Sequence, residues 1–495
     1  MTFKSTKNLL LATVFTLTTL TAQETQTKTA IKSNGQLVYS TDRKNVESFS
    51  DMFGEGEYYG RIRSNTFYNT YKNEDASHSD HIISGLGGSL VLKSATLNDF
   101  DFTAGLYFSQ AFFDIDNDNV GNLKKGKDAI SRFDYVNDDN SYMAVVGQAY
   151  LRYSGIDKTE LILGRQLVET FYTKSNDTKM IPNSFDGLVV NTNAVSKTKI
   201  KLAYLHEQKL RDHTSSHSVL MYGDSASDPS AKDYTPGKNS AGWSENDDSA
   251  MHKGLTYTEL KRHNKPTDSP LIVGDFKNNS IKNLKLDTSF YVVPELLSQI
   301  MLEANYKIDF DGFSITPAMR YIKQFDNGAG AVGGASYSKG LSATGYKDID
   351  SLEAQMIAAR VVTKIQNYKI NLGYTNVLNE ADLITPWRGF PTAGYTRSMA
   401  RYNWKANTQS YRLELVRNAN KTGIYKDVFI QTSILYTNAD EDKGNKDELY
   451  YYIGFIQNIP TLANLQWRLR LGYVDYVDDN TFNDLDARLE FNYLF

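Results

Sequence analysis

The sequence predicts an all-β protein, a transmembrane antiparallel β-barrel of eighteen strands with short periplasmic turns and long extracellular loops. Three observations predict this class: segments of about ten residues in which apolar and polar side chains alternate, connections that alternate between short and long, and a last segment that ends on Phe495. Successive strand residues point to opposite faces, so each segment has one apolar and one polar face. In a membrane barrel the apolar face meets lipid and the polar face meets a water-filled lumen.

The last twelve residues, DLDARLEFNYLF, show the alternation most clearly. Every second residue from Leu485 to Phe495 is apolar or aromatic, and the residues between Asp484 and Asn492 on the other face are charged or amides. A soluble β-sandwich would bury such an apolar face, so this segment alone leaves both classes open. The same pattern returns in NLKLDTSFYVV, IMLEANYKIDF and LQWRLRLGY, which favours the barrel.

The expected strands and their connections follow this alternation along the chain. The strands are predicted at 57–70, 81–94, 100–112, 142–154, 159–169, 185–193, 197–209, 269–278, 284–294, 299–310, 312–324, 351–365, 368–379, 409–419, 425–438, 448–459, 465–478 and 483–495. The segment 269–278 alternates poorly and is kept because an even strand number returns both ends of the barrel to the periplasm. The long connections are 113–141, 170–184, 210–268, 325–350 and 380–408. Aromatic residues near the strand ends fit the girdles expected at both membrane interfaces.

The first 22 residues are expected to be a secretory signal peptide. Lys4 and Lys7 give a positive start, an apolar run follows from Leu9 to Leu20, and Thr21-Ala22 offers a small-residue cleavage site. The alternative is a membrane anchor, but the run is short for a bilayer. Residues 23–56 then form an N-terminal polar segment, and 57–495 form the barrel.

Composition limits the function. The 495 residues include no Cys, and the net charge is −4. An exported protein without disulfides needs another source of rigidity, which a closed, fully hydrogen-bonded barrel provides. A nucleic-acid partner would require a basic face, so none is expected.

Several short motifs suggest ligands but lack essential residues. GNLKKGKD at 121–128 has Asp128 where a phosphate loop needs Ser or Thr. DIDNDN at 114–119 resembles a calcium loop, but Asn119 replaces the required Gly, so a solvated acidic loop is favoured over a loosely bound Ca²⁺.

Metal binding and catalysis are also poorly supported by the sequence. His206, His213 and His217 are close in sequence, although a strand end and a loop are a poor setting for a metal site. No catalytic arrangement is recognisable, so we expect no enzyme activity, no metal and no cofactor.

Charged residues on the polar strand faces are the candidates for setting the behaviour of a pore, because charged rings in a channel select ions by sign. A simpler role for each is pairing with a neighbour, as Arg412 and Glu414 could do. A second candidate is the connection 170–184, TFYTKSNDTKMIPNS. Folded into the lumen, it would bring Lys174, Asp177 and Lys179 toward the solute path; otherwise it is a surface loop. The predicted pore-lining or constriction residues are Arg61, Arg63, Asp177, Lys179, Arg320, Arg412, Arg468 and Arg470.

Four segments carry a resemblance to a known family, the OprD-type outer-membrane porins (porin D family). LGRQ at 163–166 followed by NDTKMIPNSFDG at 176–187 is similar to the family's Gly-Arg run followed by Asp, Arg, Pro and Phe-x-Gly, with Lys179 in place of the usual Arg. PWRGFPTAGYT at 386–396 resembles its Pro-Trp-Gly-x-Pro-x-Tyr stretch, with extra residues. SPLIVGDFKNNSIKNLKL at 269–286 and GRIRSNTFY at 60–68 resemble its eighth-to-ninth and first strands.

The resemblance implies an eighteen-stranded barrel with an inward third loop and a ladder of basic residues along one wall. Family members pass small solutes, often with carboxylate groups, some being basic amino acids. The ladder would use Arg320, Arg412, Arg468 and Arg470, with Asp177 of the loop facing it.

We therefore expect an outer-membrane porin for passive, substrate-biased diffusion of small hydrophilic solutes such as ions, amino acids or small carboxylates. The alternative is a plugged structural or adhesive barrel that acts through its extracellular loops. Expected partners are outer-membrane lipid and lipopolysaccharide, small-molecule solutes, and the barrel assembly machinery through the strand ending in Phe495. The expected assembly is a monomer or a loose trimer.

Overall fold

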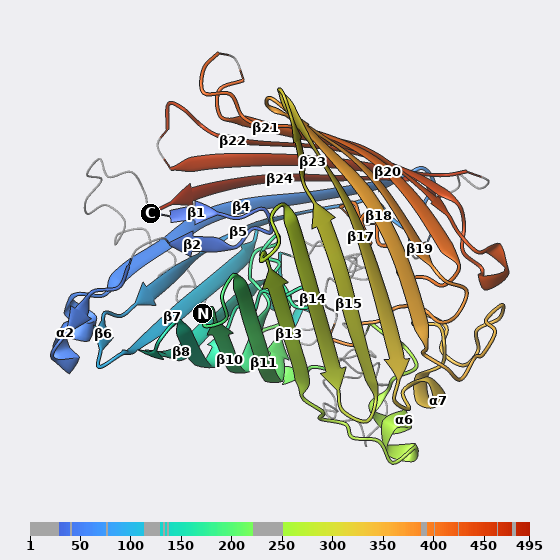
Figure 1. The fold of residues 1–495 in the computed structure, drawn as a ribbon, viewed down its shortest axis with the longest axis horizontal. Coiled ribbons are helices and arrows are strands. Elements are labelled where there is room, and N and C mark those ends of the chain that lie inside the picture. Colours follow the sequence, from blue (N-terminus) through green and yellow to red (C-terminus); the bar gives the residue numbers. More distant parts are fainter. Residues whose placement is uncertain are drawn as a thin grey trace, which may run out of the picture.

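The chain forms a closed antiparallel β-barrel in a computed structural model (Figure 1). The structure describes residues 29–39, 42–75, 78–112, 129–131, 134–135, 138–220, 251–387, 394–399, 401–423, 425–462, 464–477 and 482–495. Eighteen long strands of these residues make up the wall: β4(Glu57–Tyr71), β5(His81–Lys93), β7(Phe100–Ala111), β8(Tyr142–Ile156), β9(Thr159–Gln166), β10(Ser184–Thr192), β11(Thr198–Lys209), β13(Leu271–Asn278), β14(Leu284–Val293), β15(Leu297–Tyr306), β17(Phe313–Asp326), β18(Ala354–Ile365), β19(Tyr368–Val377), β20(Thr408–Arg417), β21(Val428–Asn438), β22(Glu448–Asn458), β23(Leu465–Tyr476) and β24(Asp484–Leu494). The predicted fold class is confirmed.

Shorter elements complete the described part of the chain. A separate two-stranded hairpin consists of β1(Thr29–Ile31) and β2(Leu37–Tyr39). The remaining short elements are β3(Asn45–Val46), α2(Phe49–Gly54), β6(Thr96–Leu97), β12(His217–Ser218), α6(Tyr257–Arg262), β16(Ile308–Phe310), α7(Gly330–Gly333) and the 3₁₀ turn η3(Glu441–Lys443). No helix in the ranges given above is long and apolar enough to cross a membrane.

The barrel closes where its last strand pairs with its first. β24 lies antiparallel to β4, with Leu494 opposite Arg61 and Asp484 opposite Tyr71. Beyond the strand, the Gly60 N–H donates to the Phe495 carbonyl at 3.0 Å, and the Phe495 N–H donates back at 3.2 Å. A closed ladder satisfies the backbone groups without leaving an edge, as a bilayer requires.

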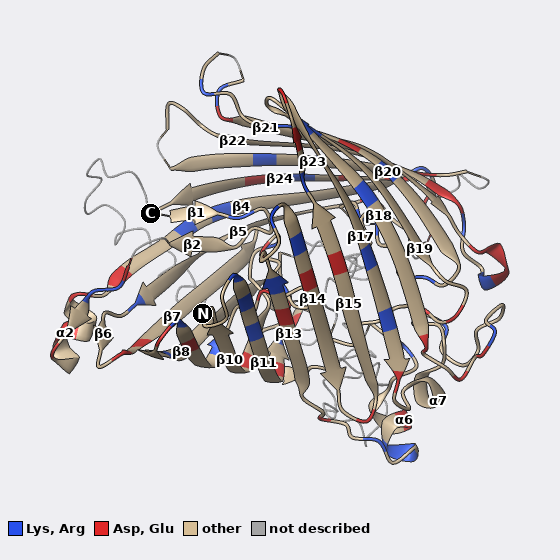
Figure 2. Cartoon of the chain, in the orientation of Figure 1, with Lys and Arg blue, Asp and Glu red and all other residues tan. Residues whose placement is uncertain are grey.

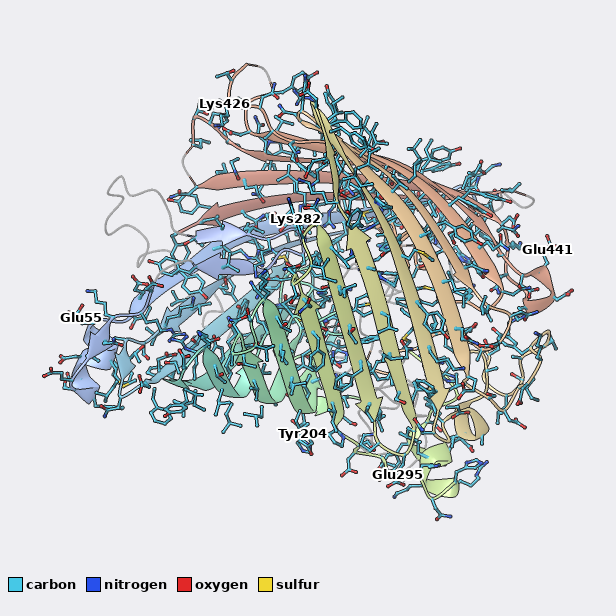
Figure 3. All side chains as sticks on the ribbon, in the orientation of Figure 1. Glu55, Tyr204, Lys282, Glu295, Lys426 and Glu441 are labelled. Atoms are coloured by element: carbon cyan, nitrogen blue, oxygen red, sulfur yellow. The ribbon has the colours of Figure 1, made fainter. Side chains whose placement is uncertain are left out.

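The two strand faces have the predicted environments. On β24 the side chains of Asp486, Arg488 and Glu490 are buried, whereas Leu489 and Phe491 are exposed on the outer surface. An exposed apolar face and a buried charged face suit a barrel in lipid and exclude the soluble sandwich. Figure 3 shows Tyr204 projecting outward from the wall, as expected of an interfacial aromatic residue.

The two ends of the barrel differ in their connections. Lys282 and Lys426 lie in turns at one end, and Glu295 and Glu441 lie in connections at the other (Figure 3). The second end also carries α6 and α7 (Figure 1). Short and long connections do not alternate strictly, because β14 and β15 are joined at this end by residues 294–296 alone, in keeping with the short gap between the predicted strands 284–294 and 299–310.

Strand β13 explains the poor alternation of residues 269–278. Leu271 and Val273 are fully buried and face inward, where they belong to a hydrophobic cluster with Tyr172 of an inward-folded connection. Its lumen face is therefore apolar at these positions, because it contacts protein instead of water.

Candidate functional site in the barrel lumen

Residues 167–183, which we call the inner loop, lie inside the barrel. The Trp387 indole N–H donates to the Tyr172 carbonyl at 3.1 Å, and the Tyr291 ring lies against both residues, 4.9 Å from the Tyr172 ring and 4.6 Å from the Trp387 ring. The Phe171 N–H donates to the carboxylate of Asp275 on β13 at 3.1 Å. The inner loop is therefore attached to the wall by aromatic packing and hydrogen bonds.

A buried ion cluster attaches the middle of the inner loop to the opposite side of the wall. Asp177 of the loop forms an ion pair with Arg61 at 2.5 Å and accepts a hydrogen bond from Arg63 at 2.8 Å, both on β4. Arg63 also donates to Glu490 on β24 at 2.8 Å. All four side chains are at most 2% exposed. The two carboxylates offset the charges of Arg61 and Arg63, and Arg468 of β23, 4.0 Å from Glu490, adds a further positive charge beside them.

Two other predicted residues also form ion pairs. Lys179 of the inner loop donates to Asp212 at 3.2 Å, and both side chains are buried. Arg320 on β17 pairs with Glu303 on β15 at 2.5 Å. The Arg320 guanidinium also lies over the Phe171 ring at 4.9 Å and the Tyr395 ring at 4.4 Å. These contacts position the loops on the wall.

A cavity of about 490 Å³ lies beside the inner loop, and we call it the passage. Its lining includes seven basic side chains and, among the described residues, no Asp or Glu. Three of the bases come from loops and four from strands β20, β23 and β24. The basic lining residues are Lys174, Arg211, Arg397, Arg412, Arg468, Arg470 and Arg488. Figure 2 shows that charged residues also lie along the middle of strands such as β11, β14 and β17.

The strand arginines of the passage differ in their pairing. Arg412 contacts Glu414, and Arg488 donates to Asp486 at 2.7 Å. Arg470 has no hydrogen bond or ion pair with another described residue, and its Nε and Nη2 atoms are shielded from solvent. Arg470 is half-buried, and shielded guanidinium N–H groups without a partner favour an anionic acceptor, so Arg470 is well placed to bind an anion.

Lys174 is the inner-loop cation that lines the passage. Burial lowers the pKa of its ammonium group, and the Glu169 carboxylate, 3.8 Å away, partly offsets this shift. Because the Lys174 ammonium group is desolvated, its charged form depends more strongly on nearby negative charge for stabilisation. A passing anion would supply such charge.

The structure brings together only part of the predicted set. Arg412, Arg468 and Arg470 line the passage, whereas Arg61, Arg63 and Asp177 form the ion cluster and Lys179 and Arg320 form ion pairs elsewhere. Asp177 thus contacts the arginines of β4 and not the expected ladder.

Three arginines of the passage, Arg211, Arg397 and Arg488, lie outside the predicted pore-lining set. Arg488 is on the polar face of the last predicted strand, but Arg211 and Arg397 belong to connections, which have no alternation to indicate the direction of a side chain.

The three histidines singled out in the sequence are not brought together at this site. His213 Nδ1 lies 2.9 Å from His217 Nε2, but His206 is exposed on β11. The described residues contain no group of three or more His, Cys, Asp or Glu that could hold a metal ion. Residues 1–22, 114–119 and 121–128 lie outside the described part of the chain.

Comparisons with known proteins agree with this architecture. A family model described as "outer membrane porin, OprD family" matches residues 118–242. The structure of Pseudomonas aeruginosa OccK8 (OprE) is similar over 90% of this chain and 99% of that chain, with a TM-score of 0.66 and 13% identity. OccK9 (OpdG) of the same organism is similar with a TM-score of 0.65 and 13% identity, over 90% of this chain and 99% of that chain. Acinetobacter baumannii OccAB4 is similar with a TM-score of 0.62 and 14% identity, over 89% of this chain and 98% of that chain. The structure of P. aeruginosa OpdK with vanillate is similar with a TM-score of 0.61 and 12% identity, over 89% of this chain and 98% of that chain. No curated protein matches the chain.

Proposed function

We propose that this chain, which is similar to outer-membrane porins of the OprD family, is a channel that favours small anionic solutes, carboxylates above all. Diffusion through the channel is passive. The observation that carries the proposal is the passage, with its seven basic lining residues and no acidic one among the described residues.

Electrostatics supports this preference. A carboxylate 4 Å from one guanidinium gains about 4 kcal/mol at an effective dielectric constant of 20, and a cation loses as much. Part of this gain replaces lost hydration, which keeps binding weak enough for release. Several bases along the passage allow a solute to move from one to the next.

One relative has a ligand of the same chemistry. The structure of OpdK was solved with vanillate, an aromatic carboxylate. The similarity of fold does not identify the solute of this chain, but a basic passage suits the same chemical class. The proposed further partners are outer-membrane lipid and lipopolysaccharide on the apolar outer face, and the barrel assembly machinery at β24.

The test is single-channel recording of the refolded protein in a planar bilayer with a tenfold KCl gradient. We expect discrete steps and a reversal potential of chloride sign, approaching about 59 mV for ideal selectivity. Benzoate added to one side should reduce the chloride current, whereas benzylamine of similar size should not. A potassium-sign potential would contradict the proposal, and silent but folded protein would favour the plugged or adhesive barrel.

A further inference from the structure

The β1–β2 hairpin is not part of the barrel wall, yet it contacts the wall from inside. Among the described strands, β1 and β2 pair only with each other, and residues 32–36, which we call the tip, form the turn between them. The turn is closed by hydrogen bonds from the Lys32 N–H to the Gln36 carbonyl and from the Gly35 N–H to the Lys32 carbonyl, each 2.9 Å long. Figure 1 shows the hairpin beside β4 and close to the C-terminus.

The base of the hairpin is packed against the wall. Leu37 is buried in the cluster that contains Tyr59 and Met180, and the Tyr39 ring stacks on the Tyr59 ring at 4.9 Å. Lys93 Nζ of β5 donates to the Tyr39 carbonyl at 3.1 Å. These contacts come from lumen-facing side chains, so they place the hairpin within the barrel.

Two wall arginines bind the tip through its backbone. Arg61 Nη1 donates to the Gly35 carbonyl at 2.9 Å, and Arg468 Nη2 donates to the Ser33 carbonyl at 3.2 Å. These arginines come from β4 and β23. Each carbonyl therefore accepts a hydrogen bond from a guanidinium N–H that could otherwise donate to an oxygen of an anion.

The tip also contacts the inner loop. Asn34 Nδ2 donates to Glu169 Oε1 at 3.1 Å and lies 3.4 Å from Ser175 Oγ. Gly35 has a φ of +80°, and a Cβ atom there would lie 1.9 Å from the Asp177 carbonyl oxygen. Only glycine combines this backbone conformation with so close an approach.

The tip takes part in the passage itself. Ser33 and Asn34 line it together with Lys174 of the inner loop and with Arg468 and Arg470 of the wall. The hairpin is thus a second element, besides the inner loop, that lies between the solute path and the wall.

We propose that residues 29–39 form an N-terminal constriction segment that narrows the passage and occupies one guanidinium N–H each of Arg61 and Arg468, which anionic solutes could otherwise bind. This inference rests on the proposed function as an anion-favouring channel. A hairpin is about 10 Å wide and 10 Å thick by strand and sheet spacing, which is comparable to the cross-section of a small-solute pore. Its removal should therefore about double the conductance and increase chloride selectivity.

The first test is deletion of residues 29–39 from the full chain, recorded beside the wild type under the KCl gradient. Folding is checked by the heat-dependent gel mobility of the barrel. A folded deletion variant with the conductance and selectivity of the wild type would overturn the inference.

Two point variants keep the inference testable if the deletion does not fold. Gly35→Ala should displace the tip and raise the conductance, whereas Gly312→Ala should behave as the wild type, because Gly312 has nearly the same φ, +79°, with no atom within 4 Å of a Cβ. Asn34→Cys introduces a lone thiol into a chain without Cys. A negatively charged methanethiosulfonate should reduce its chloride current and leave Ser280→Cys, in an exposed turn, unchanged.

The outcomes separate the two proposals. A cation-selective wild type whose conductance rises on deletion would overturn the proposed function and support the constriction segment. An anion-selective wild type whose conductance and selectivity no hairpin variant changes would support the proposed function and overturn the constriction segment. A silent wild type that becomes conducting on deletion would show that the segment closes the pore, and silence of both would overturn both proposals.

Discussion

Replacing Asp177 by Asn tests the reasoning about the buried ion cluster. Asp177, Arg61, Arg63 and Glu490 carry no net charge together, and Asn leaves one positive charge uncompensated. Removing one partner of a buried pair costs about 3–5 kcal/mol, since the remaining charge stays desolvated. The cluster joins β4, the inner loop and β24, so we expect the loss to lower the stability of the whole barrel.

The assay is unfolding in urea of the refolded protein in detergent micelles. With an m value of about 3 kcal/mol/M, the midpoint should fall by about 1 to 1.7 M. Trp387 donates to the Tyr172 carbonyl, so in a variant whose other three Trp are replaced by Phe its fluorescence also reports whether the inner loop is released.

The matched control is Asp309→Asn. Asp309 pairs with Lys307 at 2.6 Å, but both side chains are more than half exposed, so its loss should cost under about 1 kcal/mol. Equal midpoints for the two variants would refute the argument that the buried cluster stabilises the barrel.

Three further predictions concern Arg470 in the passage, Gly60 where β4 pairs with β24, and His252 in a connection. Arg470→Gln should lower the chloride-to-potassium permeability ratio roughly fivefold, because one charge about 8 Å from an ion in water changes the energy of each of the two ions by about 0.5 kcal/mol, in opposite directions. The control Arg262→Gln, on exposed α6, should leave the ratio unchanged, and equal ratios for the two variants would contradict the role of Arg470. Gly60→Ala places a Cβ 2.1 Å from a neighbouring carbonyl oxygen and should cost about 1–3 kcal/mol, lowering the refolded yield, whereas Gly54→Ala meets no atom within 4 Å. Burial lowers the pKa of His252 to about 4 from its usual 6.5. The contribution of neutral His252 to the free energy of unfolding is therefore fully present above pH 6.5 and decreases by up to about 3 kcal/mol as pH falls through 4. Unfolding midpoints that do not change between pH 7 and 4 would refute this.

The wall of the barrel could be predicted from the sequence because its signal is local. Alternation in segments such as 284–294 and 483–495 follows directly from lipid on one face and lumen on the other. The predicted alternation of short and long connections held less well, as at 294–296, since loop length at the outer end has no physical requirement comparable to the alternation of a strand.

The site was less predictable because its contacts join distant residues. Arg412, Arg468 and Arg470 were expected to line a pore from strand register alone, and they line the passage. Arg61 and Arg63 have the same register but bind Asp177, a partner that only the path of the inner loop decides. The hairpin lies in residues 23–56, which were expected to be merely polar, because its three-residue strands are too short to show a period.

The pairing of β4 with β24 has a consequence for how the barrel is made. Arg63 and Glu490, in contact across this seam, are 427 positions apart. The first strand therefore has no partner on one edge until the last has been exported, and an open edge in lipid leaves backbone groups unsatisfied at several kcal/mol each. Insertion is thus coupled to the arrival of the C-terminal strand, so a chain cut short within β24 should remain a periplasmic substrate for proteases and never become a leaky half-barrel.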